Sequence, residues 1–199
     1  MAAVPPHITT TSLTGIYTLN RTLSDSSQQT LKMQNVGWLV RQAVAYSNIE
    51  TTLKQYTTTT AATTEAKQQH HLDQHQLSTG GIRNFEDQIL DWQPRVHANK
   101  IWGEVRGKSR YAAVSAIEDE WLREGWDESC TGEGGKVVEA FVEGVKDRWT
   151  AHQVWGFAIV EGQRRHVRRI IARREGWEDE RVRMVYDWKG VVEGDAGNE

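Results

Sequence analysis

The chain has few of the features that mark secreted or membrane-spanning proteins. Its 199 residues include one cysteine, Cys130, so no intramolecular disulfide can form. No apolar run approaches the ~18 residues that a membrane span needs. Residues 1–20 also lack the basic segment and apolar stretch of a signal peptide. We therefore expect a cytoplasmic protein with no membrane partner.

The chain also lacks a large excess of charge of either sign, and it lacks the common catalytic motifs. The 24 lysines and arginines nearly balance 27 aspartates and glutamates, giving a net charge of -3. This balance provides no general attraction to nucleic acid. There is no glycine-rich phosphate loop after a strand, no paired-cysteine metal motif and no Gly-x-Ser-x-Gly turn. These absences argue against nucleotide-driven and serine-hydrolase chemistry, and we expect no cofactor and no bound metal.

Aromatic residues are what the chain has in quantity, since it contains nine tryptophans. Alternation of apolar residues with a period of two is typical of a β-strand that buries one face. In the segment 149–159, this alternation places five apolar residues on one face: Trp149, Ala151, Trp155, Phe157 and Ile159. The pattern predicts a sheet closed around an interior, and therefore a small-molecule cavity.

The order of elements predicts one mainly β domain. We expect a strand over Ser12–Leu23, a helix from an N-cap within Ser24–Ser27 to about Ser47, and a meander of antiparallel strands. A tight turn is expected at Gly107–Ser109, and Val137–Val145 fits either a helix or a strand. Three hairpin-linked strands end near Trp188. Residues 1–11 are expected to be a flexible N-terminus, 12–190 the domain, and 191–199 a flexible acidic tail.

Several short segments carry a resemblance to a known superfamily. The order of strand, helix and long meander resembles the calycins, which include lipocalins and cytosolic fatty-acid-binding proteins. The segments that also look like small lipocalin-like proteins of filamentous fungi are Leu13–Tyr17, Gly37–Arg41, Leu90–Trp92, Trp102–Arg110, Trp155–Phe157 and Val185–Asp187. The resemblance implies a single antiparallel calycin or lipocalin-like β-barrel with a helix after the first strand.

The same resemblance implies a function. Some lipocalin-like fungal proteins serve natural-product pathways, so the chain is expected to bind a small hydrophobic metabolite or biosynthetic intermediate. It would then act in secondary metabolism as a cofactor-independent cyclase or isomerase. The alternative is a passive carrier of a fatty acid or metabolite. The oligomeric state stays open.

Five polar residues are candidates for catalysis: Arg95, His97, His152, Arg169 and Tyr186. The first two belong to a cluster of carboxylates, arginine and histidine over residues 86–97, which suits a general acid or base. An Asp91–Arg95 ion pair that fixes a bend is the alternative. His152 lies opposite the tryptophan face of its strand, and Tyr186 shares a face with Val182.

The arginine-rich run 164–174 alternates, so half of its charges would approach a barrel interior. An inward arginine needs a carboxylate or enolate partner, because a buried unpaired charge is costly. The alternative is a surface ladder paired with acidic residues near 175–180. The aromatic residues expected to line the pocket, or else to pack the core, are Trp38, Trp92, Trp102, Trp149, Trp155 and Phe157.

A metal site is a further alternative. His71, Asp73 and His75 share one face of an expected strand, and two histidines with a carboxylate can bind a divalent cation. A polar strand face without any metal explains the same spacing.

Overall fold

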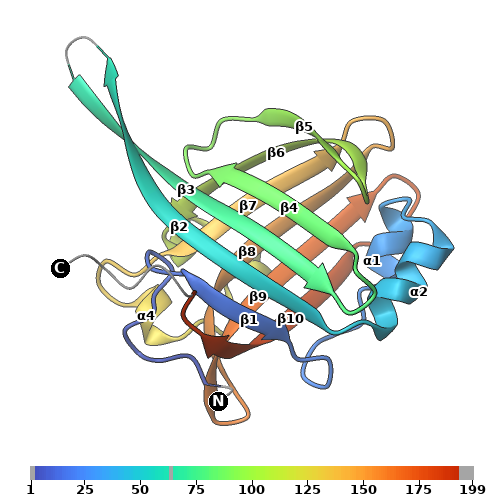
Figure 1. Ribbon diagram of the computed structural model, residues 1–199, viewed down its shortest axis with the longest axis horizontal. Coiled ribbons are helices and arrows are strands. Elements are labelled where there is room, and N and C mark those ends of the chain that lie inside the picture. The colour runs from blue at the N-terminus through green and yellow to red at the C-terminus, as the bar shows by residue number, and fades with distance from the viewer. Residues whose placement is uncertain (1–2, 63–64, 193–199) are drawn as a thin grey trace.

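Ten antiparallel strands form one sheet that curls into a nearly closed barrel (Figure 1). The computed structural model describes residues 3–62 and 65–192. The strands are β1 (Gly15–Leu19), β2 (Ile49–Ala62), β3 (Glu65–Ser78), β4 (Arg83–Ile89), β5 (Arg95–Asn99), β6 (Gly103–Ala112), β7 (Val137–Gly144), β8 (Trp149–Val160), β9 (Gln163–Arg174) and β10 (Glu180–Gly190). This confirms the predicted mainly β barrel.

The strand order is β4-β3-β2-β1-β10-β9-β8-β7-β6-β5. Because the last strand pairs with the first, β1 and β10 lie in the middle of the sheet. The sheet therefore ends in β4 and β5, which face each other across a seam without a backbone ladder. Asn99 Nδ2 donates to Asn84 Oδ1 at 3.0 Å to tie one end of this seam. A bridge between Asp91 and Arg110 ties the other end.

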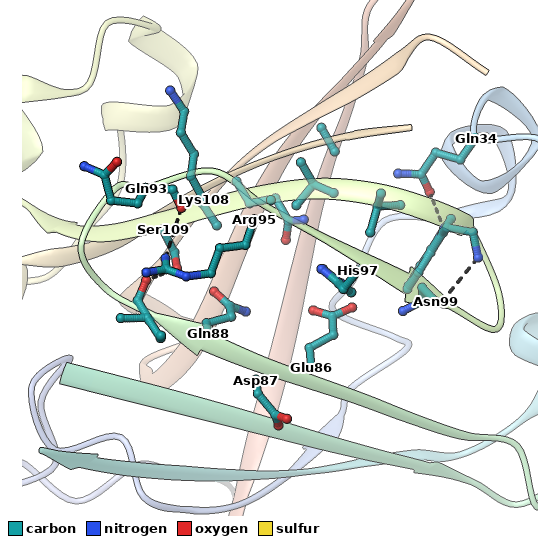
Figure 2. Close-up of a pocket in the computed structure, with 18 of the residues that line it drawn as sticks. Gln34, Glu86, Asp87, Gln88, Gln93, Arg95, His97, Asn99, Lys108 and Ser109 are labelled. Carbon is teal, nitrogen blue, oxygen red and sulfur yellow. Dashed lines mark hydrogen bonds between the residues drawn. The ribbon is translucent and has the colours of Figure 1, made fainter. Parts of the chain in front are cut away.

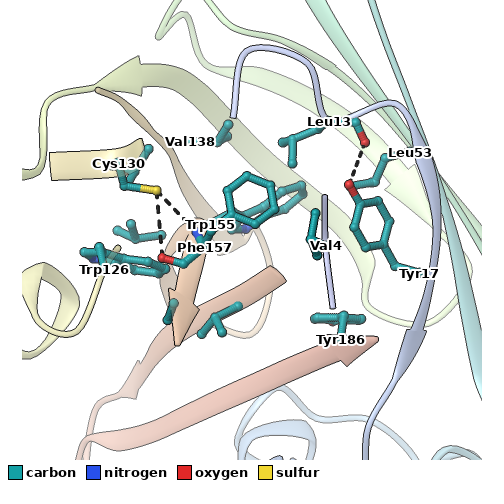
Figure 3. Packing of buried hydrophobic residues seen from close by; sticks show 14 of the residues in the cluster. Val4, Leu13, Tyr17, Leu53, Trp126, Cys130, Val138, Trp155, Phe157 and Tyr186 are labelled. Carbon is teal, nitrogen blue, oxygen red and sulfur yellow. Dashed lines mark hydrogen bonds between the residues drawn. The ribbon is translucent and has the colours of Figure 1, made fainter. Parts of the chain in front are cut away.

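One end of the barrel interior is filled with large apolar side chains (Figure 3). Leu13, Tyr17 and Phe157 are fully buried there. The chain before β1 joins this packed end, because Val4 is buried and its backbone N–H donates to the carbonyl of Arg164 at 2.8 Å. Figure 1 places α1 and α2 at the opposite end of the barrel. The flexibility expected for residues 1–11 stays a prediction.

Two short helices follow β1, where the sequence predicted one long helix. They are α1 (Gln28–Met33) and α2 (Trp38–Tyr46). The break falls at Asn35, whose φ of 61° lies in the left-handed region, and at Gly37, the N-cap of α2. Asparagine tolerates this conformation better than most residues, which explains why the helix ends here. None of the helices in the described residues is long and apolar enough to cross a membrane.

The middle of the chain differs from expectation in one strand. The predicted turn at Gly107–Ser109 is wrong, because these residues lie inside the continuous strand β6. Gly107 is paired with Val142 across the sheet, so here glycine serves as a small inward residue. The segment 137–145, left open between helix and strand, forms β7. The expected acidic tail lies mostly outside the described residues, which end at 192.

A connecting segment covers the outside of β8 and β9. It runs from the 3-10 helix η1 (Val114–Ala116) through α3 (Glu120–Arg123) to α4 (Glu128–Thr131). Cys130 is buried beneath it, and burial raises the pKa of its thiol to about 11. Gly156 makes this contact possible, since a Cβ there would lie 2.8 Å from the Trp126 ring. The thiol therefore stays protonated at neutral pH and packs in the protein core.

Candidate functional site

The end of the barrel beneath α1 and α2 is hollow. Two adjoining hollows share Gln34, Glu86, Trp102 and Gln153 in their walls, and we refer to them together as the interior cavity. The first follows the seam between β4 and β5 (Figure 2). The second lies below α1, against β9 and β10. The same strands whose inward side chains fill the packed end thus also provide the walls of this cavity.

The seam side of the cavity is polar. Glu86 and Gln88 come from β4, and Arg95 and His97 come from β5. Figure 2 shows Glu86 and His97 pointing toward each other, whereas the neighbouring Asp87 points away. Asn84 Nδ2 donates to Glu86 Oε1 at 3.1 Å. The sequence therefore brings a carboxylate inward here.

Arg95 is held by a bidentate ion pair with Asp91, with both nitrogen–oxygen distances at 2.7 Å. The hydrogen bonds from Arg95 lower the pKa of Asp91 to about 2. This is the ion pair that the sequence offered as an alternative to catalysis. Arg95 still borders the cavity, but its charge is already paired.

Arg168, on β9, forms the charged part of the opposite wall. The guanidinium lies over the Trp155 ring, 3.8 Å from its centroid, and 5.0 Å from the centroid of Tyr186. The residue is 4% exposed, and its Nη2 atom has no hydrogen-bond partner in the part of the chain that the structure describes. Among residues 3–62 and 65–192, it forms no ion pair. A buried guanidinium without a carboxylate is costly unless a ligand satisfies it.

His166 orients this arginine. Its Nδ1 lies 3.1 Å from the carbonyl oxygen of Gly156, which can only accept, so Nδ1 carries the proton. Nε2 is then free to accept from Arg168 Nε at 3.4 Å. Complete burial and the positive charge of Arg168 hold the pKa of His166 well below its usual value. The imidazole is therefore neutral, and its hydrogen bond with Nε holds Arg168 in the wall of the second hollow.

Tyr186, on β10, lies beside Arg168 of the neighbouring strand and borders the cavity. Burial is the main influence on the pKa of its hydroxyl and raises it. The charge of Arg168 lowers this pKa and that of Glu86 raises it, and the net shift is upward. The phenol therefore stays protonated at neutral pH. Within the described residues, its hydroxyl donates only to the sulfur of Met184 at 3.8 Å, and sulfur is a weak acceptor. Tyr186 is thus a second donor on the same wall as Arg168.

Several more buried polar atoms around the cavity have no partner in the described protein. They are Thr30 Oγ1, Gln74 Oε1, Gln88 Oε1 and Trp149 Nε1, all on residues that line the two hollows. Leaving a buried donor or acceptor unpaired costs about 1–3 kcal/mol. Several such atoms facing one space indicate a cavity that binds a partly polar ligand.

The structure brings five of the eleven candidate site residues to the cavity. These are Arg95, His97, Trp102, Trp149 and Tyr186. Trp155 and Phe157 are buried in the adjacent packed core. Trp102 is fixed by a hydrogen bond from its Nε1 to Gln34 Oε1 at 3.0 Å.

The other four candidates lie outside the barrel interior. His152 is on the outer face, where its Nε2 is 2.9 Å from Glu139 Oε1. Arg169 is also outside, donating to the Trp121 carbonyl at 2.6 Å. Trp38 is 62% exposed on α2. Trp92 packs against Lys108 and Arg110. None of these four side chains borders either hollow of the cavity in the described residues.

Arg168, in place of Arg169, is the inward arginine that the sequence could have identified. The hairpin turn at Glu161–Gly162 pairs Val160 with Gln163, and this register places Trp155 opposite Arg168. Since residues opposite each other on paired strands share a face, an inward Trp155 requires an inward Arg168. The signal was the length of the turn, because a two-residue turn fixes which residues of β8 and β9 are paired and therefore share a face. Gln153 follows from the alternation of residues 149–159, whereas Glu86 and Gln74 had no comparable signal.

The possible metal ligands of β3 face outward. His71 stacks on Tyr56 with ring centroids 4.7 Å apart, and His75 packs against Phe85. In the described part of the chain, no three histidine, cysteine, aspartate or glutamate side chains are grouped so as to hold a metal ion. The alternation puts these residues on one face, as expected, but their contacts are with aromatic rings.

Known proteins similar to this chain come from fungi. No known family model matches it. The pericyclase pydY of an Acremonium species is 26% identical over 190 residues, covering 94% of this chain and 97% of the relative. The probable pericyclase scpY of Mollisia scopiformis is 27% identical over 192 residues, covering 96% of both proteins. The similarity thus extends along almost the whole chain.

Among solved structures, a mutant of the fatty acid transporter REP1-NXSQ has the same kind of fold. The TM-score is 0.50 at 9% sequence identity, covering 89% of this chain and 98% of that one. Such a likeness shows the barrel architecture alone.

Proposed function

We propose that this chain is a cyclase of the pericyclase type, which folds a hydrophobic substrate inside the interior cavity and binds one of its carbonyl oxygens with Arg168. The observation that carries the proposal is the buried, unpaired Nη2 of Arg168 at an aromatic wall. It is supported by the full-length similarity to two fungal proteins named as pericyclases.

The cavity provides two sources of rate enhancement. Apolar walls that include Leu31, Val44 and Ile170 confine a flexible chain, so that its reacting ends meet without the entropy cost paid in solution. A hydrogen bond from Arg168 to a conjugated carbonyl withdraws electrons from the attached double bond. In a dry site such a donor is stronger than in water. A pericyclic reaction shifts electrons in one cyclic array, so the protein needs no redox partner for it.

Arg168→Met tests this role. The substitution keeps an apolar side chain of similar length over Trp155 but removes the donor, and we expect turnover to fall about 10²–10³-fold. Arg169→Met is the matched control, because the adjacent arginine lies on the outer face against Trp121. A similar fall in both variants, with both still folded, would contradict the assignment.

Deletion of the gene in the producing organism provides the substrate for the assay. An intramolecular pericyclic step gives a product that is an isomer of its substrate. We therefore expect the deletion strain to accumulate a compound of the same mass and different chromatographic retention. The purified protein should convert this compound in buffer with a chelator. A compound that binds the protein but is never converted would instead establish the alternative of a passive carrier.

A further inference from the structure

The unpaired buried atoms of the interior cavity differ between its two walls. On the wall of β8, β9 and β10, the unpaired donors are Arg168 Nη2 and Trp149 Nε1. On the wall of β3 and β4, the unpaired acceptors are Gln74 Oε1 and Gln88 Oε1. A ligand with a carbonyl alone would satisfy only the first wall.

Glu86 is the strongest acceptor of this second wall. It is half-buried, and it lines both hollows of the cavity. Its register partner on β3 is Gln74, so the two side chains are neighbours on the inward face. Its only hydrogen bond in the described residues is from Asn84 Nδ2, and no cation there lies within ion-pair distance. An ionised carboxylate has room for several donors, so most of its capacity faces the cavity.

Glu86 and Arg168 do not neutralise each other. They lie on opposite walls of the second hollow and are not paired. Both line the same hollow as Tyr186, and both act electrostatically on its hydroxyl. A polar group held between them would accept from the arginine and donate to the glutamate.

We propose that the substrate carries a head group that combines a carbonyl with an adjacent N–H or O–H donor, as in a secondary amide or an enol, and that Glu86 binds the donor. This inference rests on the proposed function, since it assigns the substrate class of the same cavity. Glu86 thereby fixes which way the head group is turned, and the hydrophobic chain extends toward Leu31 and Val44 beneath the helices.

Two matched probes test the donor requirement. N-methyldodecanamide has one N–H, and N,N-dimethyldodecanamide has none, while both keep the carbonyl and the same chain. Binding is measured by isothermal titration calorimetry. We expect the wild-type protein to bind the N-methyl compound about 10-fold more tightly, since hydrogen bonds to charged groups are the strong ones.

Variants of Glu86 assign this preference to one residue. Glu86→Leu should abolish the preference, and Glu86→Gln, which keeps a neutral acceptor and the shape, should reduce it to a few-fold. Asp87→Asn is the matched control, because the neighbouring carboxylate points away from the cavity (Figure 2), and it should keep the full preference. If Glu86→Leu does not fold, the Gln variant alone decides.

The outcomes separate the inference from the function on which it rests. Equal affinities of the wild-type protein for the two amides would overturn the role of Glu86. So would a preference for the N-methyl compound that persists in Glu86→Leu, or that is undiminished in Glu86→Gln. Each of these results would leave the cyclase proposal intact. Dodecanoic acid binding more tightly than either amide would also overturn it, because an anion is repelled by a free carboxylate. Failure of all three compounds to bind would contradict the hydrophobic cavity and both proposals.

Discussion

The two ends of the barrel interior differ, although the same strands build both. At the packed end, β8 contributes Phe157, and at the hollow end it contributes Ala151 and Gln153. On β3, Leu72 is followed inward by Gln74. On these two strands, large apolar inward residues are thus followed by small or polar ones where the strand reaches the cavity. The cavity arises from side-chain size and polarity, while the backbone alternation continues without a break.

The largest expected effect comes from breaking the packed end. Phe157→Ala should lower the free energy of unfolding by about 3–5 kcal/mol, because a fully buried ring leaves a cavity that its neighbours cannot fill. Ile170→Ala at the hollow end should cost less than about 2 kcal/mol, since this side chain is only half-buried and already borders open space. Denaturation with urea measures both. Equal losses would show that the two ends are packed alike.

A second prediction concerns His166, which lies where the two ends meet. It contacts the rings of Tyr17, Phe157 and Tyr186, and it also holds Arg168. Its pKa is lowered in the folded protein, so the unfolded chain binds a proton that the folded chain does not. Stability from the neutral imidazole is present above the unfolded pKa of about 6.5 and is lost as the pH falls below it.

We therefore expect the free energy of unfolding of the wild-type protein to fall by up to about 1.4 kcal/mol per pH unit between pH 6.5 and 5.5. In His166→Gln, this part of the slope should be absent. His7→Gln, a substitution of an exposed histidine, should keep the wild-type slope. Urea denaturation at several pH values measures the three slopes, and identical slopes in all three proteins would refute the prediction.

The sequence predicted the packed end better than the hollow end. Inward positions of Trp155 and Phe157 follow from alternation, because burial selects apolar residues at every second position. On β4, apolar alternation does not indicate which residues point inward. There Phe85 is 55% exposed and packs on His75, while its polar neighbour Glu86 faces the cavity. Where a ligand site replaces core, the inward residues are polar, and the pattern no longer distinguishes inside from outside.

The pairing register of β8 and β9 explains why the sequence pointed to Arg169 and not to Arg168 as a candidate site residue. The arginines at 168 and 169 are the same residue type at adjacent positions, so composition cannot choose between them. Only the pairing of β9 with β8 places Arg168 beneath Trp155. Similarly, the break between α1 and α2 depends on the left-handed backbone at Asn35, which helical periodicity does not register.

The smallest expected effect distinguishes an unpaired from a paired indole. Trp149 Nε1 has no partner at the hollow end, whereas Trp126 Nε1 donates to the Leu122 carbonyl at 2.8 Å on the outside of the barrel. Trp149→Phe removes a buried unsatisfied donor, and this gain offsets part of the lost contact area, so stability should change by less than about 1 kcal/mol. Trp126→Phe leaves the carbonyl without its donor and should cost about 1–3 kcal/mol. Urea denaturation of both variants compares them, and an equally large loss in Trp149→Phe would mean that its N–H is satisfied in solution. The donor wall of the cavity would then consist of Arg168 and Tyr186 alone.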